Sequence, residues 1–185
     1  MKKPSHLAHV VFRTSQYREM IEWYKKVLSA EVTYSNEMVA FITFDDEHHR
    51  VAFINNPNVK EAVKNTRGVD HVAFTYKSLK DLLDNYSELK KIGIEPFWCI
   101  NHGPTTSMYY RDPDENQVEL QVENFDTVEE STRFFYSEEF AENPIGVDFD
   151  PENLKNRMKL GTPEGELKTR PKIGPRGLQD GVPLG

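Results

Sequence analysis

A short apolar run that contains a histidine occurs twice in this chain, and this repeat constrains the fold more than any other feature. The first copy spans Leu7–Phe12 with His9 at its third position, and the second spans Gly68–Phe74 with His71 at its fourth. When His71 is overlaid on His9, the sequence after each run also matches: a polar break, an amphipathic helical pattern and further strand-like segments. The chain therefore reads as two copies of one unit.

The first copy predicts a strand, a helix and three further strands. Residues 7–13 have the composition of a strand, and their alternation places His9 and Val11 on one face. Residues 15–28 repeat apolar side chains at helical spacing, with charged side chains on the opposite side. Polar turns then separate three expected strands, at residues 31–34, 38–44 and 49–54.

The second copy predicts the same βαβββ order. Its helix is expected to begin at Ser78, because Ser78 and Asp81 have the spacing of a capping box, and to end at Gly93. The apolar stripe of this helix consists of Leu79, Leu82, Leu83, Tyr86 and Leu89. Strands are expected at residues 68–74 before the helix and at 95–100, 107–111 and 117–123 after it.

These patterns predict an α+β domain over residues 5–125, built from units at 5–56 and 68–123 that a polar linker joins. The repetition stops after this domain, so residues 126–185 are expected to form a C-terminal helical and extended arm. The expected arm elements are a helix within 128–140 that docks through its phenylalanines, a helix that starts at Asp150-Pro151, and an extended stretch after Gly161.

Composition excludes several classes of function. The chain has 185 residues, which is enough to enclose a core, and its net charge of −7 argues against a nucleic-acid partner. The single cysteine, Cys99, allows no internal disulfide and suits a reducing compartment. No continuous apolar stretch suggests a secretion signal or a membrane span. A cytoplasmic protein without a membrane partner is expected.

A carboxylate near the end of the second copy completes a candidate metal site. Alternation along residues 117–122 puts Glu119 on the face opposite Val118, Leu120 and Val122. If the copies pack together, His9, His71 and Glu119 can reach one cavity. Two imidazoles and a carboxylate form the facial set that holds a divalent metal with open positions. A lone strand histidine is more often a core or surface side chain, but the same residue at the same register in both copies favours ligands.

The duplicated units, the paired histidine strands and the segment Tyr109–Leu120 resemble the vicinal oxygen chelate superfamily. This superfamily includes glyoxalases, fosfomycin-resistance thiol transferases, methylmalonyl-CoA epimerases and type I extradiol ring-cleaving dioxygenases. The resemblance covers about residues 5–125. It implies that the two βαβββ units form an eight-stranded open barrel around a metal, held by His9, His71 and Glu119.

The segment His48–Phe53 is similar to the His-His-x-x-Ala segment of the extradiol dioxygenases. This similarity implies that His49 is the active-site acid/base, because a histidine titrates near neutrality and can take and return a proton. Alternation places His49 on the same face as Val51 and Phe53. The alternative is an exposed pair of turn histidines.

Two further residues are similar to substrate-contacting positions of the extradiol branch. Tyr109 stands four residues before Pro113, where these enzymes carry a tyrosine that hydrogen-bonds the substrate or oxygen; Tyr110 points the other way and is expected to pack. His102 resembles the histidine of their His-Gly loop, which orients the substrate, although the segment from His102 to Tyr109 is shorter here. The alternative for His102 is a solvated loop histidine.

The resemblance implies metal-dependent extradiol cleavage of a small, catechol-type aromatic diol by dioxygen, with Fe(II) as the metal. Mn(II) would satisfy the same ligands. The familiar extradiol enzymes have a second pair of units that this chain lacks, so the arm is expected to cover the site or a second subunit of a homodimer. The alternatives are a thiol transferase, glyoxalase or epimerase on the same scaffold, or a non-catalytic protein that binds an aromatic ligand.

Overall fold

The computed structural model describes residues 1–61, 63 and 67–178. The chain divides into two compact units: Met1–Thr66 with Asp112–Asn116, and Arg67–Arg111 with Gln117–Gly185. Parts of two predicted segments lie outside the described residues, namely 62 and 64–66 of the linker and 179–185 of the arm.

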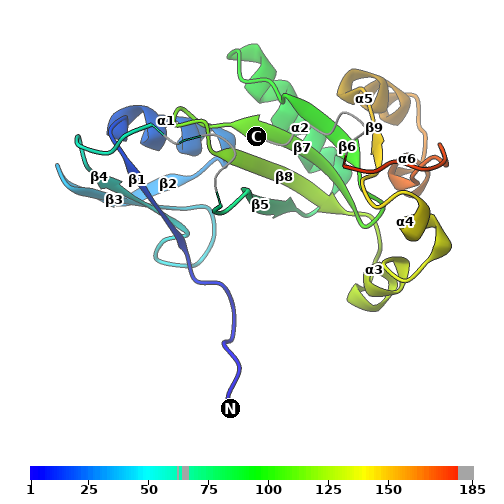
Figure 1. Ribbon diagram of the computed structural model, residues 1–185. Helices are drawn as coiled ribbons and strands as arrows, with labels where there is room; N and C mark the ends of the chain where they lie inside the picture. The colour runs from blue at the N-terminus through cyan, green and yellow to red at the C-terminus, as the bar shows by residue number, and fades with distance from the viewer. Residues whose placement is uncertain (62, 64–66, 179–185) are drawn as a thin grey trace. The chain divides into compact units, whose positions relative to one another are not determined.

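The first unit is a sheet with one helix on it (Figure 1). Its strands lie in the order β1-β4-β3-β2, with β1 parallel to β4 and the other neighbours antiparallel. Helix α1 contacts β3 and β4. The elements are β1 (Val10–Thr14), α1 (Tyr17–Val27), β2 (Glu31–Ser35), β3 (Val39–Thr43) and β4 (Val51–Asn55).

Tyr24 is the centre of the core in the first unit. This α1 residue is fully buried, and its ring lies 5.4 Å from Phe12 of β1 and 5.3 Å from Phe53 of β4. Its hydroxyl donates a hydrogen bond of 3.1 Å to Oδ2 of Asp112, in the turn that returns to this unit from the second. The buried hydroxyl is therefore satisfied by a residue far along the chain.

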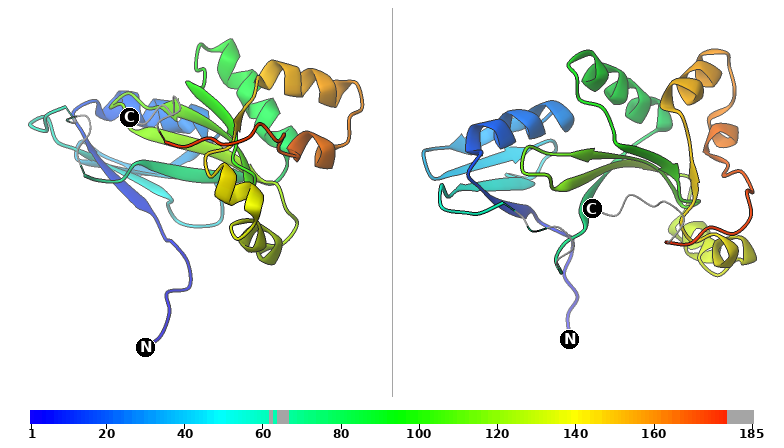
Figure 2. Two further views of the ribbon diagram at one scale, coloured as in Figure 1. Left: turned by 45° about the vertical axis from the view of Figure 1, so that its right-hand side comes forward. Right: turned by 45° about the horizontal axis from the view of Figure 1, so that its top comes forward.

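The second unit repeats the arrangement (Figure 2). Its strands lie in the order β5-β8-β7-β6-β9, with β5 parallel to β8 and the other neighbours antiparallel. Helix α2 packs on one face of this sheet. The elements are β5 (His71–Tyr76), α2 (Leu79–Lys91), β6 (Trp98–Asn101), β7 (Thr105–Arg111), β8 (Gln117–Glu123) and β9 (Val147–Asp148).

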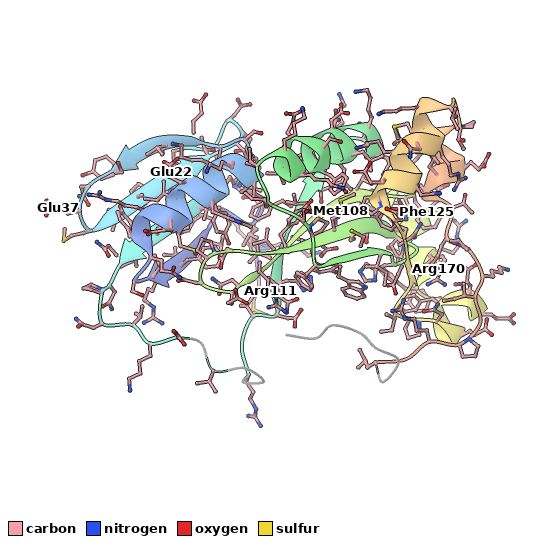
Figure 3. The ribbon with its side chains drawn as sticks, turned by 90° about the horizontal axis from the view of Figure 1, so that it is seen from above. Glu22, Glu37, Met108, Arg111, Phe125 and Arg170 are labelled. Atoms are coloured by element: carbon pink, nitrogen blue, oxygen red, sulfur yellow. The ribbon has the colours of Figure 1, made fainter. Side chains whose placement is uncertain are left out.

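The predicted start and apolar stripe of α2 are confirmed. The Ser78 side chain accepts a hydrogen bond from the Asp81 backbone N–H, which satisfies a donor that the first turn leaves unpaired. All the predicted stripe residues are buried, and they share a core with Met108 of β7, labelled in Figure 3, and with Leu120 of β8. This core occupies one face of the sheet and leaves the other face for polar side chains.

The C-terminal arm differs in two places from the prediction. One helix was expected within 128–140, but two form, because the Ser137 side chain accepts a hydrogen bond from the Phe140 N–H and caps a second helix. After Gly161 a short helix buries Leu167, where an extended stretch was expected. The predicted helix after Asp150 is confirmed. The helices are α3 (Val128–Phe134), α4 (Glu138–Glu142), α5 (Pro151–Lys159) and α6 (Glu164–Lys168).

The predicted α+β class with two βαβββ units is confirmed. In the described residues, the hydrogen-bonded strands form two separate sheets, each open at its edges. The strands expected to carry the paired histidines begin later than predicted, at Val10 and at His71, so His71 is the first residue of β5 and His9 lies just before β1. No helix in the described part of the chain is long and apolar enough to cross a membrane.

The α2 stripe gives a direct test of this packing. Leu82 is fully buried, so Leu82→Ala should lower the free energy of unfolding by about 2–5 kcal/mol through lost burial and a residual cavity. Leu160→Ala is the control, because Leu160 is 87% exposed and should change stability by less than about 0.5 kcal/mol. Chemical denaturation of both variants measures the difference. Equal losses would show that α2 does not pack as described.

Candidate active site

The face of the second sheet opposite α2 gathers the predicted site residues of that unit. Glu119 on β8 is in register with Tyr109 on β7 and with Ala73 on β5. Because side chains alternate along a strand, His71, two residues before Ala73, lies on the same face as Glu119 and Tyr109. The parallel pairing of β5 with β8 therefore brings the histidine of the repeat to the carboxylate. We call His71, His102, Tyr109 and Glu119 the Glu119 cluster.

His71 and Glu119 form a close ion pair. Nε2 of His71 lies 3.0 Å from Oε2 of Glu119, whose residue is 4% exposed. The bond from Glu119 raises the pKa of His71 to about 9, against the opposing effect of burial. Burial would raise the pKa of Glu119, but hydrogen bonds from His71 and Ser107 hold it below its usual value. Glu119 is therefore a carboxylate at neutral pH.

Asp70 sets the orientation of the His71 ring. Its Oδ2 lies 2.7 Å from Nδ1 of His71, so Nδ1–H donates a hydrogen bond to the Asp70 carboxylate, and Nε2 is the nitrogen that faces Glu119. A carboxylate behind an imidazole in this way fixes the tautomer and makes the other nitrogen a better ligand. Asp70 was not predicted as a site residue, because neighbouring side chains within a strand point to opposite faces. The alternation does not apply to Asp70, because β5 begins only at His71.

Tyr109 and His102 complete the Glu119 cluster. The Tyr109 ring stands edge-on to His71, with centroids 5.3 Å apart, and its hydroxyl lies 3.0 Å from Nε2 of His102. Burial lowers the pKa of His102 and raises that of Tyr109, so both side chains are neutral at pH 7. Tyr110 is buried on the other face of the sheet, as predicted. Its hydroxyl lies 3.8 Å from the Met108 sulfur.

The first unit brings His9 and His49 together. Their ring centroids are 4.4 Å apart, and the His49 ring also stacks on Phe41 of β3 at 4.8 Å. Phe41 is in register with Ala52 and faces away from α1. The expectation that His49 shares a face with Val51 and Phe53 is therefore wrong, because His49 lies in the loop before β4 and strand alternation does not extend to it.

The His49 ring lies in a basic environment. Its Nδ1 is 2.5 Å from Nδ1 of His48, so one of the two nitrogens donates and the other accepts. Burial lowers the pKa of His49, and the neighbouring His48 and His9 lower it further. His49 is therefore a neutral base at pH 7, able to accept a proton.

The donors of the Glu119 cluster suit a divalent metal. Two ligands that bind one metal at about 2.1 Å and at right angles lie about 3 Å apart. The His71 and Glu119 donor atoms show this spacing, at 3.0 Å, with Asp70 behind the imidazole. In neither unit do three His, Cys, Asp or Glu side chains of the described residues gather as a complete metal site. Among the described residues, the second unit thus brings together two candidate ligands, and His9 belongs to the first unit.

A family model described as the Glyoxalase/Bleomycin resistance protein/Dioxygenase superfamily matches residues 6–120 of this chain. The solved structure of lactoylglutathione lyase from Agrobacterium tumefaciens is similar with a TM-score of 0.53 and 15% identity, covering 65% of this chain and 96% of that one. At this identity the likeness concerns the fold alone.

Two curated relatives from Rhodococcus globerulus are similar to this chain along most of its length. Biphenyl-2,3-diol 1,2-dioxygenase 3 is 48% identical over 166 residues, which are 89% of this chain and 87% of the relative. Biphenyl-2,3-diol 1,2-dioxygenase 2 is 47% identical over 163 residues, which are 88% of this chain and 86% of the relative.

The raised pKa of His71 predicts how stability depends on pH in the metal-free protein. Its pKa is about 9 in the folded state, against about 6.5 for an unfolded chain. The protonated ring therefore stabilises the fold fully below about pH 6.5, and this contribution is lost as the pH rises through about 9.

Denaturation midpoints measured with a chelator present, between pH 6 and 10, should fall in the wild type and fall less in His71→Gln. His6→Gln is the control, because His6 pairs with Glu47 at the exposed surface and should keep the wild-type slope. Identical slopes in wild type and His71→Gln would contradict the ion pair.

Proposed function

The chain belongs to the glyoxalase/bleomycin resistance protein/dioxygenase superfamily, and from this premise we propose that it cleaves the ring of an aromatic vicinal diol with dioxygen, on the extradiol side. The observation that carries this function is the identity of nearly half of the aligned residues with two diol dioxygenases, over most of both chains. The Glu119 cluster supports it, because it combines metal donors with neutral hydrogen-bonding groups on one face of a sheet.

The numbering in the relatives' names locates the bond that breaks. Their substrate has hydroxyls on carbons 2 and 3, and dioxygen is added across carbons 1 and 2. The broken bond thus lies beside the diol and not between its two oxygens, which defines extradiol cleavage. For this chain we propose a substrate of the same class, a catechol that carries an aryl group next to one hydroxyl.

His9, His71 and Glu119 are the proposed ligands of a divalent metal, which we propose is Fe(II). His71 and Glu119 are supported by their donor spacing, and His9 by its place in the sequence repeat. A metal bound by these residues would supply Lewis acidity and a redox-active centre for the reaction of the diol with dioxygen. Glu119 supplies a permanent negative charge, and Asp70 keeps the His71 imidazole in the tautomer that can bind metal.

The remaining residues act on protons and on orientation. Neutral His49 is the proposed base that takes a proton from the diol, because neighbouring imidazoles and burial favour its uncharged form. Tyr109, which lies beside His71, is the proposed hydrogen-bonding contact for the substrate. His102 reaches the substrate region through its bond to Tyr109, so its proposed role is orientation. We propose that the protein is a cytoplasmic homodimer and that its binding partners are the diol and dioxygen.

Turnover tests this function directly. The protein is loaded with Fe(II) without oxygen, mixed with catechol, 3-methylcatechol or biphenyl-2,3-diol, and exposed to air while the coloured ring-opened product is followed. We expect product from all three, with the highest kcat/KM for biphenyl-2,3-diol. A fully metal-loaded protein that produces no colour from any catechol would contradict the proposal.

Metal content tests the ligands without turnover. His9→Ala, His71→Ala and Glu119→Ala should each weaken Fe(II) binding by more than about 100-fold, and Asp70→Ala should weaken it by about 10–100-fold, the usual effect of a group behind a ligand. Asp84→Ala is the control for Asp70→Ala, because Asp84 pairs with Lys80 on the exposed side of α2. Full metal content in Glu119→Ala would remove Glu119 from the site.

The two neighbouring histidines separate acid/base chemistry from loop structure. His49→Gln should lower kcat by about 10²–10⁴-fold with metal content unchanged, because a positioned base contributes that much. His48→Gln removes the ring that bonds to His49 but keeps the proposed base, so its kcat should fall far less. Equal losses in the two variants would assign the effect to the loop.

A further inference from the structure

The C-terminal arm reaches the Glu119 cluster through the backbone. Strand β9 pairs with β6, so that Asn101 is opposite Val147, and the segment before β9 passes beside the His102 ring. The carbonyl oxygen of Ile145 lies 2.5 Å from Nδ1 of His102. The arm thus supplies a hydrogen-bond partner to a site residue that the sequence pattern placed only in a loop.

This contact fixes where the His102 proton lies. A backbone carbonyl can only accept a hydrogen bond, so Nδ1 of His102 must carry the proton. In a neutral imidazole the other nitrogen, Nε2, then has a free lone pair. Burial favours the neutral form of His102. The Tyr109 hydroxyl, 3.0 Å from Nε2, must therefore be the donor in the bond between the two side chains.

The single phenol proton has two acceptors within reach. Glu119 also attracts the Tyr109 hydroxyl, and this attraction contributes to the raised pKa of Tyr109. If His102 carried its proton on Nε2, it would donate to Tyr109, and Tyr109 would then donate to Glu119. When the His102 proton is on Nδ1, the Tyr109 hydroxyl donates its hydrogen bond to Nε2 of His102. The Glu119 oxygens then stay open to His71 and Ser107, which lower the pKa of this carboxylate.

Several contacts hold the arm in this position. Arg170 is 8% exposed, and it donates to the carbonyl oxygens of His102 at 3.2 Å and Asn143 at 2.8 Å; Figure 3 shows it beside α3 and α4. The Asn143 side chain accepts from the N–H groups of Ile145 and Gly146. Gly146 has φ +121°, and a Cβ there would meet the Asn101 carbonyl oxygen at 2.3 Å, so only glycine allows this approach.

We propose that Ile145 and Arg170 of the arm are positioning residues that hold His102 in its Nδ1–H tautomer, so that the Tyr109 hydroxyl donates its hydrogen bond to His102 and presents its oxygen to the substrate as a hydrogen-bond acceptor. This inference rests on the proposed function for the identity of the substrate. Tyr109 then selects a ligand whose hydroxyl still carries a proton, which is the form of a diol that has lost only one of its two protons. The tautomer itself depends only on the described contacts.

Nitrogen NMR tests the tautomer without turnover. The full chain, labelled with ¹⁵N-histidine, is studied at pH 7 without metal and with Zn(II) as a diamagnetic substitute, and His102→Asn assigns the ring signals. We expect a protonated Nδ1 and an unprotonated Nε2 for His102 in both states. Tyr109→Phe should keep this pattern, because the arm and not Tyr109 sets it. A protonated Nε2 in the wild type, or a change of tautomer in Tyr109→Phe, would overturn the inference.

A pair of arginine variants tests the arm. Arg170→Met should lose the single Nδ1–H pattern of His102 and give signals of mixed tautomers, because the carbonyl groups that Arg170 holds are released. Arg157→Met is the control: Arg157 lies on the same arm but pairs with Glu166 at the surface, so the His102 signals should not move. An unchanged His102 tautomer in folded Arg170→Met would show that Arg170 does not position His102. If that variant does not fold, the wild type and Tyr109→Phe still decide. If the Fe(II)-loaded wild type cleaves no catechol but its His102 shows the Nδ1–H pattern, the proposed function is contradicted and this inference is not.

Discussion

The parallel pairing of β5 with β8 is the constraint on which the polar face of the second unit depends. It brings together two strands that are far apart in the sequence. In its register Ala73 is opposite Glu119, so His71, two residues before Ala73, lies on the same face as Glu119. A shift of one residue would turn either side chain toward the apolar core under α2. The buried apolar face of β8, with Val118 and Leu120, therefore fixes the register that the chemistry needs.

The sequence predicted those features that repeat or alternate. The overlay of His9 and His71 anticipated two βαβββ units, and alternation anticipated that Val118 and Leu120 would be buried and that Tyr109, not Tyr110, would lie beside His71. Periodicity works there because each strand or helix must bury one face, so the pattern of apolar residues follows directly from the packing.

The errors fall where regular structure ends. His49 and Asp70 each lie just before a strand, so alternation misplaced the first and concealed the second. Ser137 interrupts a run of helical residues through its side chain, which periodicity does not detect. The Ile145 carbonyl could not be foreseen, because a backbone oxygen leaves no trace in the residue type and acquires its role only from the path of the arm.

The short turn that the second copy contributes to the first unit limits how the chain can be divided. Residues 5–56 are one copy of the repeat, yet the buried hydroxyl of Tyr24 in this copy bonds to Asp112, which lies in the sequence of the other copy. A fragment that stops at the linker therefore lacks the residue that pairs with this buried tyrosine, and it contains less than one complete structural unit.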